Sequence, residues 1–224
     1  MMEEAMVFGG LSSIGFLLTE RLLEAGVVVY SISSAVTDEE KDREEENELF
    51  LGRNALFHND RDKPRSVAKH LILADTFRMK QESNDELKKK MGHLLADSSQ
   101  FQRVLFLSSL EVCGQHVDKK RKRRAACPTS VRGRAANEME LFFINLLHES
   151  KRKEAIILRT DLNLISDKCD GEIIAALING LMEQEHEGLD VVHFKKGLDS
   201  NDAINEKLRS LLPRNYEKWL QRKS

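Results

Sequence analysis

The sequence predicts an α/β fold in which a doubly wound parallel sheet lies between two layers of helices. Segments typical of strands and of helices alternate along most of the 224 residues, a pattern that favours parallel strands joined by crossover helices. The strand segments are short, continuous apolar runs, as expected where both faces of a sheet are covered. The chain shows neither an internal repeat nor a linker rich in proline, glycine or serine. We therefore expect one three-layer domain over residues 1–224.

The first unit of this fold is the clearest, because residues 5–34 follow the order strand, glycine turn, helix, strand. Gly9 and Gly15 stand where the chain leaves the strand and enters the helix, and there a Cβ atom would obstruct a close approach. Gly26 follows the helix and is expected to end it. The buried side of this helix is expected to carry four leucines, Leu17, Leu18, Leu22 and Leu23.

A turn of this kind predicts a site for the pyrophosphate of a dinucleotide, either NAD or NADP. The free N–H groups and the positive dipole end of the helix would face the phosphates. The turn departs from the pattern G-x-x-G-x-x-G because Ser12 stands at the middle glycine position. Ser12 can still offer an N–H and a hydroxyl, although its Cβ must be accommodated. The candidate phosphate-binding residues are Gly9, Gly10, Ser12, Ser13, Ile14 and Gly15.

The other elements follow in the order that the fold requires. A charged run over residues 37–48 is expected to be a solvated loop or an exposed helix. Further strands are expected over residues 54–58, 70–74, 103–109, 155–159 and 189–194, with a polar turn over 59–64. Helices are expected over residues 82–98, 134–150 and 171–185, and from about residue 201. The inward faces of the first two carry Leu87, Met91, Leu94 and Leu95, and then Met139, Phe142, Phe143, Leu146 and Leu147.

Composition sets limits on function. The formal net charge is −2 and hydrophobic residues make up 41% of the chain, so the whole chain gives no argument for nucleic-acid binding. No run of about eighteen apolar residues and no signal-peptide pattern occurs, so we expect a cytoplasmic protein without a membrane span. The three cysteines match neither a disulfide framework nor a zinc site, which favours reduced thiols and no bound metal. They are Cys113, Cys127 and Cys169.

A run of six basic residues, Lys119–Arg124, lies between two of the expected elements. Consecutive cations could contact a phosphate, a nucleic acid or an acidic protein surface. Acidic runs elsewhere balance this charge, and the run lacks the interleaved aromatic residues that bind single-stranded nucleic acid. A solvated loop, an anionic partner and a localisation signal all stay open.

Five short motifs occur in order between residues 5 and 165. They are the glycine turn at 7–15, Phe-His-Asn-Asp-Arg-Asp at 57–62, Leu-Ile-Leu-Ala-Asp at 71–75, Val-Leu-Phe-Leu-Ser-Ser-Leu-Glu-Val-Cys-Gly at 104–114 and Ile-Ile-Leu-Arg-Thr at 156–160. In this order they resemble motifs of the extended short-chain dehydrogenases, the group of nucleotide-sugar epimerases and dehydratases. The resemblance implies a Rossmann-like domain with a dinucleotide cofactor. It also implies that residues 165–224 hold a reduced remnant of the family's substrate lobe and C-terminal helices.

The resemblance further implies where the cofactor would lie. Ser33 would adjoin the adenosine ribose, and Asn59 or Asp60 would reach toward the adenine. Ala74 and Ser108, at the ends of two strands, would complete the cofactor site. The second strand ends in serines, without the aspartate or arginine that would indicate a preference, so NAD and NADP stay open.

The catalytic pair of that family is absent from this chain. The family uses Y-x-x-x-K, in which a tyrosine exchanges a proton with the substrate and a lysine lowers its pKa. The matching segment, residues 128–136, places Arg132 at the tyrosine position and Ala136 at the lysine position. Arginine stays protonated, so it is a poor general base. Ser109, Glu111 and Arg132 are left as catalytic candidates, although Ser109 could equally cap its strand and Glu111 could be a loop charge.

Three functions fit these observations. A dinucleotide-binding protein with a non-catalytic or regulatory role agrees best with the retained turn and the missing tyrosine and lysine. An oxidoreductase or epimerase with an atypical acid or base would depend on Ser109, Glu111 or Arg132. A scaffold with an empty site would act through protein partners. The resemblance also implies a homodimer, formed here by the helices at residues 82–98 and 134–150.

Overall fold

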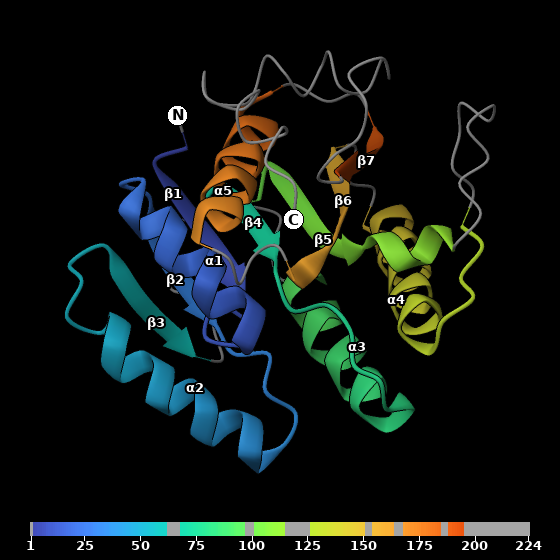
Figure 1. Cartoon of the computed structure of the whole chain (residues 1–224), viewed down its shortest axis with the longest axis horizontal. Coiled ribbons are helices and arrows are strands. Elements are labelled where there is room, and N and C mark those ends of the chain that lie inside the picture. The colour runs from blue at the N-terminus through green and yellow to red at the C-terminus, as the bar shows by residue number, and fades with distance from the viewer. Residues whose placement is uncertain are drawn as a thin grey trace.

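The computed structural model describes residues 2–61, 68–96, 101–114, 126–150, 154–163, 168–184 and 188–194 (Figure 1). The basic run at 119–124 and the helix expected from about residue 201 lie outside these residues. The strands are β1 (Glu4–Phe8), β2 (Val28–Ile32), β3 (Phe57–Arg61), β4 (His70–Leu73), β5 (Arg103–Ser109), β6 (Ala155–Thr160) and β7 (Leu189–Phe194). The helices are α1 (Ser13–Glu24), α2 (Asp38–Leu51), α3 (Gln81–Ala96), α4 (Val131–Glu149) and α5 (Lys168–Glu183), with a short 3-10 helix, η1 (Leu110–Cys113).

The described strands form one parallel sheet of seven, in the order β3-β2-β1-β4-β5-β6-β7. The chain builds outward from β1 to β3, crosses back to β4 beside β1, and then builds outward to β7. This order confirms the predicted doubly wound sheet. It also places a change of direction between β1 and β4, where the carboxyl ends of the strands open a crevice.

Alternating side chains in the strands give the sheet a hydrophobic core on each face. In β1, Ala5 and Val7 belong to one core, whereas Met6 and Phe8 belong to the other, because successive side chains of a strand point to opposite faces. Helices α1 and α5 pack on the first face, and α3 and α4 pack on the second (Figure 1). The inward leucines and Met91 of α3 are buried as predicted, and so are Met139, Phe143 and Leu147 of α4.

Strand β3 begins three residues later than the sequence pattern indicated. Asn54 closes a turn after α2, since its N–H donates to the Leu51 carbonyl and its Oδ1 accepts from the Leu56 N–H at 2.9 Å. Such a side-chain turn delays the start of the strand, and the Leu56 carbonyl is the first group of this segment to accept from β2, from the Val29 N–H. Asn59, which was expected in the polar turn over residues 59–64, therefore lies in β3.

Helix α4 also differs, because it begins at Val131 rather than at residue 134. Ser130 is the N-cap, and its hydroxyl accepts from the Gly133 N–H at 2.9 Å. Serine is among the strongest N-cap residues, so the cap overrides the apolar pattern that begins farther along the helix. Arg132 therefore lies in the first turn of α4.

The charged run after β2 is a helix, α2, whose last turn contacts the first helix layer through Leu51 in the core and the Phe50 ring against Phe16 of α1. Thr37 is its N-cap and accepts from the Glu40 N–H at 3.2 Å. The acidic residues of its first turn suit the positive end of the helix dipole. Polar side chains attach α2 to the carboxyl ends of the strands: Asn47 donates to the Leu11 carbonyl at 2.9 Å, and Glu44 accepts from the Ser34 N–H. Helix α2 therefore borders the crevice of the sheet.

Candidate functional site

The glycine turn between β1 and α1 is shaped by close contacts that only glycine permits. Gly9 has a φ of 76°, and a Cβ atom there would lie 2.4 Å from the Cβ of Asp75. A Cβ atom on Gly15 would lie 1.8 Å from the Gly9 carbonyl oxygen. The start of α1 thus packs directly on the backbone of the turn. Both glycines are needed to bring the helix N-terminus to the end of β1.

Ser12, at the middle position of the turn, is the N-cap of α1. Its hydroxyl accepts from the Gly15 N–H at 3.1 Å, and its carbonyl accepts from the Phe16 N–H. The first N–H groups of a helix have no partner within the helix, and here the serine occupies one of them. The N–H groups of Ser13 and Ile14 come before the first N–H that bonds within the helix. This end of α1 therefore has one donor fewer, that of Gly15, but keeps the two that could face an anion.

Two hollows adjoin this turn at the carboxyl ends of β1, β2 and β4. The first hollow has a volume of about 250 Å³ and includes residues from α1, α2 and the loop after β4. It is lined by Ser12, Ser13, Ile14, Ser34, Ala35, Glu40, Arg43, Glu44, Asp75, Phe77 and Arg78. The second hollow has a volume of about 210 Å³. It is lined by Leu11, Ser33, Lys41, Glu44, Glu45, Glu48, Asn59 and Lys90. Glu44 lines both, so its carboxylate marks the boundary between them.

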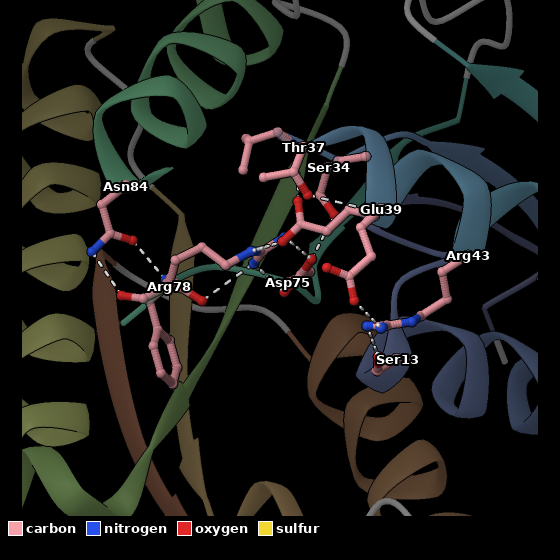
Figure 2. A network of polar contacts seen from close by, with 12 residues as sticks. Ser13, Ser34, Thr37, Glu39, Arg43, Asp75, Arg78 and Asn84 are labelled. Atoms are coloured by element: carbon pink, nitrogen blue, oxygen red, sulfur yellow. Dashed lines mark hydrogen bonds and ion pairs between the residues drawn. The ribbon is translucent and has the colours of Figure 1, made fainter. Parts of the chain in front are cut away.

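A polar network crosses the first hollow and joins α2 to the loop after β4 (Figure 2). Arg78 donates to both oxygens of Asp75 at 2.7 Å, and its Nε donates to Glu40 at 2.7 Å. The Ser34 hydroxyl donates to the same Asp75 carboxylate at 2.6 Å. Asn84 fixes the loop, since it bonds both the N–H and the carbonyl of Arg78. A guanidinium and two carboxylates therefore hold one another in place.

The carboxylates of α2 differ in their electrostatic environment. Burial raises the pKa of Glu40, but hydrogen bonds from Arg78 and Val36 outweigh burial, and the pKa lies below its usual value. For Glu44 burial is the largest influence and raises the pKa, despite hydrogen bonds from Ser33 and Ser34. Glu44 is only 8% exposed. The two carboxylates, one turn apart, thus differ in how readily they hold a negative charge.

Many of the predicted cofactor-binding residues come together at these hollows. Ser12, Ser13 and Ile14 line the first hollow, and Ser33 and Asn59 line the second. The glycines at 9, 10 and 15 form the turn itself.

Three further residues of the predicted cofactor set do not line either hollow. Asp60 is half-buried in β3, and Ala74 belongs to the hydrophobic core. Ser108 is fully buried and donates its hydroxyl to Glu140. Ser108 therefore serves a contact between β5 and α4 in this structure.

The catalytic candidates form a separate cluster between β5 and α4. Glu111 accepts from the Ser130 hydroxyl at 2.5 Å and lies 3.7 Å from Arg132. The Ser109 hydroxyl accepts from the Glu111 N–H and caps η1. The Arg132 guanidinium lies over the Phe77 ring, 5.9 Å from its centre. Each of the three polar groups thus has a contact that stabilises the chain itself.

Several residues of the site were not predicted from the sequence. The structure adds Glu40, Arg43 and Glu44 from α2, and Phe77 and Arg78 from the loop after β4. One signal was available, because Thr37 and Glu40 form the pattern T-x-x-E, which is typical of a helix start. That pattern predicts a helix from residue 38 but not where the helix lies.

Within the residues that the structure describes, no group of three or more His, Cys, Asp or Glu side chains is arranged to hold a metal ion. No helix in the described part of the chain has the length and apolar character needed to cross a membrane.

Comparison with solved structures relates this arrangement to known proteins. No protein-family model matches the sequence, and no curated protein matches it significantly. A dTDP-glucose 4,6-dehydratase from Bacillus anthracis, in complex with NAD, has a TM-score of 0.62 and 10% identity, covering 94% of this chain and 81% of that chain. A UDP-glucuronic acid 4-epimerase from Bacillus cereus, in complex with NAD, has a TM-score of 0.61 and 12% identity, covering 85% of this chain and 78% of that chain.

A third similar structure is a UDP-N-acetylglucosamine 4-epimerase from Methanobrevibacter ruminantium, with a TM-score of 0.60 and 13% identity, covering 93% of this chain and 80% of that chain. At such identities the likeness concerns the fold. The chain therefore has a Rossmann-like α/β fold of the kind found in nucleotide-sugar epimerases and dehydratases.

Proposed function

We propose that this chain binds a nicotinamide dinucleotide in the two hollows and does not carry out the proton transfer of the epimerases it resembles in fold. The observation that carries this proposal is the position of the hollows beside the glycine turn, at the point where the strand order reverses. Ligands of open α/β sheets bind in that crevice. Together the hollows fall within the roughly 300–1,000 Å³ of small-molecule sites. Similar structures contain NAD.

The groups around the first hollow suit a pyrophosphate. The N-terminus of α1 offers the N–H groups of Ser13 and Ile14 together with the positive end of the helix dipole. Arg43 lies 3.4 Å from the Ser13 hydroxyl and is half exposed. Arg78 lines the same hollow. Because Arg78 is bonded to Asp75 and Glu40, the helix end and Arg43 are the groups that would meet phosphate oxygens.

The absence of the family's acid-base pair supports a non-catalytic or regulatory role. Arg132 and Ala136 stand at the positions of the tyrosine and lysine, and Ala136 is fully buried. A general base must be able to give and take a proton near the operating pH, and arginine cannot. Among the neighbouring groups, Glu111 is bonded to Ser130 and paired with Arg132. We therefore expect cofactor binding without turnover.

Titration of the purified chain with NAD+, NADH, NADP+ and NADPH by calorimetry tests the proposal. We expect at least one dissociation constant in the micromolar range, about −8 kcal/mol. The variant Ser13→Asp places a negative charge at the exposed start of α1 and should weaken binding about tenfold or more, while the same charge favours the helix by about 0.3–1 kcal/mol. Gln102→Glu adds one negative charge at an exposed residue directly before β5, at the amino ends of the strands and away from the hollows. It should leave binding unchanged.

The other outcomes separate the alternative functions. No binding of any of the four dinucleotides at millimolar concentration would contradict the proposal and favour a scaffold. Turnover of a nucleotide sugar with bound cofactor, lost in Ser109→Ala or Glu111→Ala, would instead identify an atypical oxidoreductase or epimerase. The scaffold has one observation in its favour, because Leu49 and Phe50 at the end of α2 are 79% and 77% exposed.

A further inference from the structure

The adenosine half of a dinucleotide needs an acceptor for its ribose hydroxyls, and the end of β2 does not supply one. In dinucleotide-binding folds an aspartate or glutamate about 20 residues after the glycine turn accepts from these hydroxyls. This chain has Ser33 and Ser34 at the end of β2. Two carboxylates contact this end of β2: Asp75 accepts from the Ser34 hydroxyl but is held by Arg78, and the other comes from a different element, α2.

That carboxylate is Glu44, whose side chain reaches back to the end of β2. Its Oε1 accepts from the Ser34 N–H at 3.2 Å, and the Ser33 hydroxyl also bonds to it. Glu44 is nine-tenths buried and lines both hollows. A carboxylate has room for about four hydrogen bonds, so acceptor positions remain after these two contacts. The Ser34 backbone thus fixes an acceptor between the phosphate end and the second hollow.

The charges around the second hollow oppose an additional phosphate. Three carboxylates line it, those of Glu44, Glu45 and Glu48, against two lysines. The Lys90 ammonium donates to the Ala35 carbonyl at 2.7 Å, and Lys41 pairs with Asp38. A phosphate monoester carries a charge of about −1.5 to −2 at neutral pH. This hollow therefore has three carboxylates and, unlike the first, neither an arginine nor a residue of the first turn of α1 among the described residues of its lining, where the 2′-phosphate of NADP would need donors and cations.

We infer that Glu44 takes the place of the missing strand-end acid: it accepts from the adenosine ribose hydroxyls of NAD(H) and excludes the 2′-phosphate of NADP(H). This inference rests on the proposed function, because it assigns one residue of the same site and the cofactor that the site selects. The acid is supplied 11 residues after Ser33, by a helix instead of the strand end. Its position depends on the bond to the Ser34 backbone, which brings α2 over the crevice.

The test compares dissociation constants for NAD+ and NADP+ in three forms of the full chain. The wild-type chain should bind NAD+ at least about tenfold more tightly than NADP+, a difference of about 1.4 kcal/mol. Glu44→Gln removes the charge at nearly constant shape and should reduce that ratio about tenfold, chiefly by improving NADP+ binding. Glu46→Gln makes the same change at an exposed position of α2 that lines neither hollow, and should keep the wild-type ratio.

The outcomes distinguish this inference from the proposed function. If the wild-type chain binds NADP+ as tightly as NAD+, or if Glu44→Gln leaves the ratio unchanged, the inference is overturned while dinucleotide binding stands. If the wild-type chain binds neither, both fail. A wild-type ratio near one overturns the inference even where the variant is poorly folded. Glutamine keeps nearly the shape of Glu44, so it should be tolerated, and a thermal unfolding curve without ligand checks this.

Discussion

Single residues in the glycine turn have structural roles, and the proposed function adds binding roles to them. Gly15 allows α1 to contact the Gly9 carbonyl, and Ser12 caps the same helix through the Gly15 N–H. The serine at the middle position therefore stabilises the helix start and also occupies one of its free donors. The turn keeps the shape of a phosphate-binding turn with fewer N–H groups available to a ligand.

Gly15→Ala should destabilise the chain and abolish dinucleotide binding. The added Cβ would lie 1.8 Å from the Gly9 oxygen, which is backbone and cannot rotate away. We expect a loss of about 1–3 kcal/mol in the free energy of unfolding, typical of overpacking. Gly92→Ala, within α3, is the matched control because nothing lies within 4 Å of its Cβ. It should stabilise α3 by about 1 kcal/mol. Equal effects in urea unfolding would contradict the assigned packing.

At the scale of elements, α4 is joined to the end of the sheet by a buried ion pair. Glu140, in α4, is 1% exposed and accepts from both Nε and Nη2 of Arg159 in β6. The Ser108 hydroxyl of β5 donates to the same carboxylate. Arg159 also contacts Cys113 and His193. This network thus ties α4 to three strands, β5, β6 and β7, and to η1.

Glu140→Gln should lower the free energy of unfolding by about 3–5 kcal/mol, because it leaves the buried Arg159 charge without its counter-ion. The matched control is Glu138→Gln, on the same helix, where the carboxylate pairs with Lys88 and is 39% exposed. That change should cost about 0–1 kcal/mol. Denaturant unfolding of both variants measures the difference. A loss below about 1 kcal/mol for Glu140→Gln would argue that the pair is not needed for stability.

For the whole molecule, the order of the strands decides which side chains meet. The crevice between β1 and β4 receives residues from α1, α2 and the loop after β4, although these are up to 66 positions apart in sequence, from Ser12 to Arg78. The same order places β4 beside β1, where His70 Nδ1 lies 3.3 Å from the Glu4 carbonyl. The stability of the sheet is thereby linked to the protonation of one histidine.

The stability of the fold should rise with pH through the range in which His70 titrates. Burial, and then the charge of Arg103, lower the pKa of His70 below its usual 6.5, although the bond to Glu4 opposes this. The unfolded chain then binds more protons than the folded chain between the two pKa values, so unfolding becomes less favourable as pH increases. The contribution is complete above about pH 6.5 and is lost as pH falls through the folded pKa.

His70→Gln should remove this part of the pH dependence, measured as the free energy of unfolding between about pH 8 and pH 5. His93→Gln changes an exposed histidine of α3 and should keep the wild-type profile. A wild-type slope that survives in His70→Gln would contradict the role assigned to this residue.

The sequence by itself determined the order of the elements, the glycine turn and the inward faces of α3 and α4. These features depend on apolar periodicity and on steric needs within a few residues, which can be read locally. The predicted helix starts were less accurate where a polar side chain sets the start, as Ser130 does for α4. That Arg132 and Ala136 replace the tyrosine and lysine of the resembled family stays a prediction.

Only the tertiary structure decided what borders the crevice. Helix α2 has no apolar stripe to orient it, since Glu44 and Leu51 are its buried residues, so its charged residues gave no indication of where they would lie. Its position comes from contacts with distant groups, the Leu11 carbonyl, the Ser34 N–H and Arg78. The pairing of Glu140 with Arg159 has the same origin. Charges select partners through space, so their partners follow from the assembled sheet rather than from local sequence.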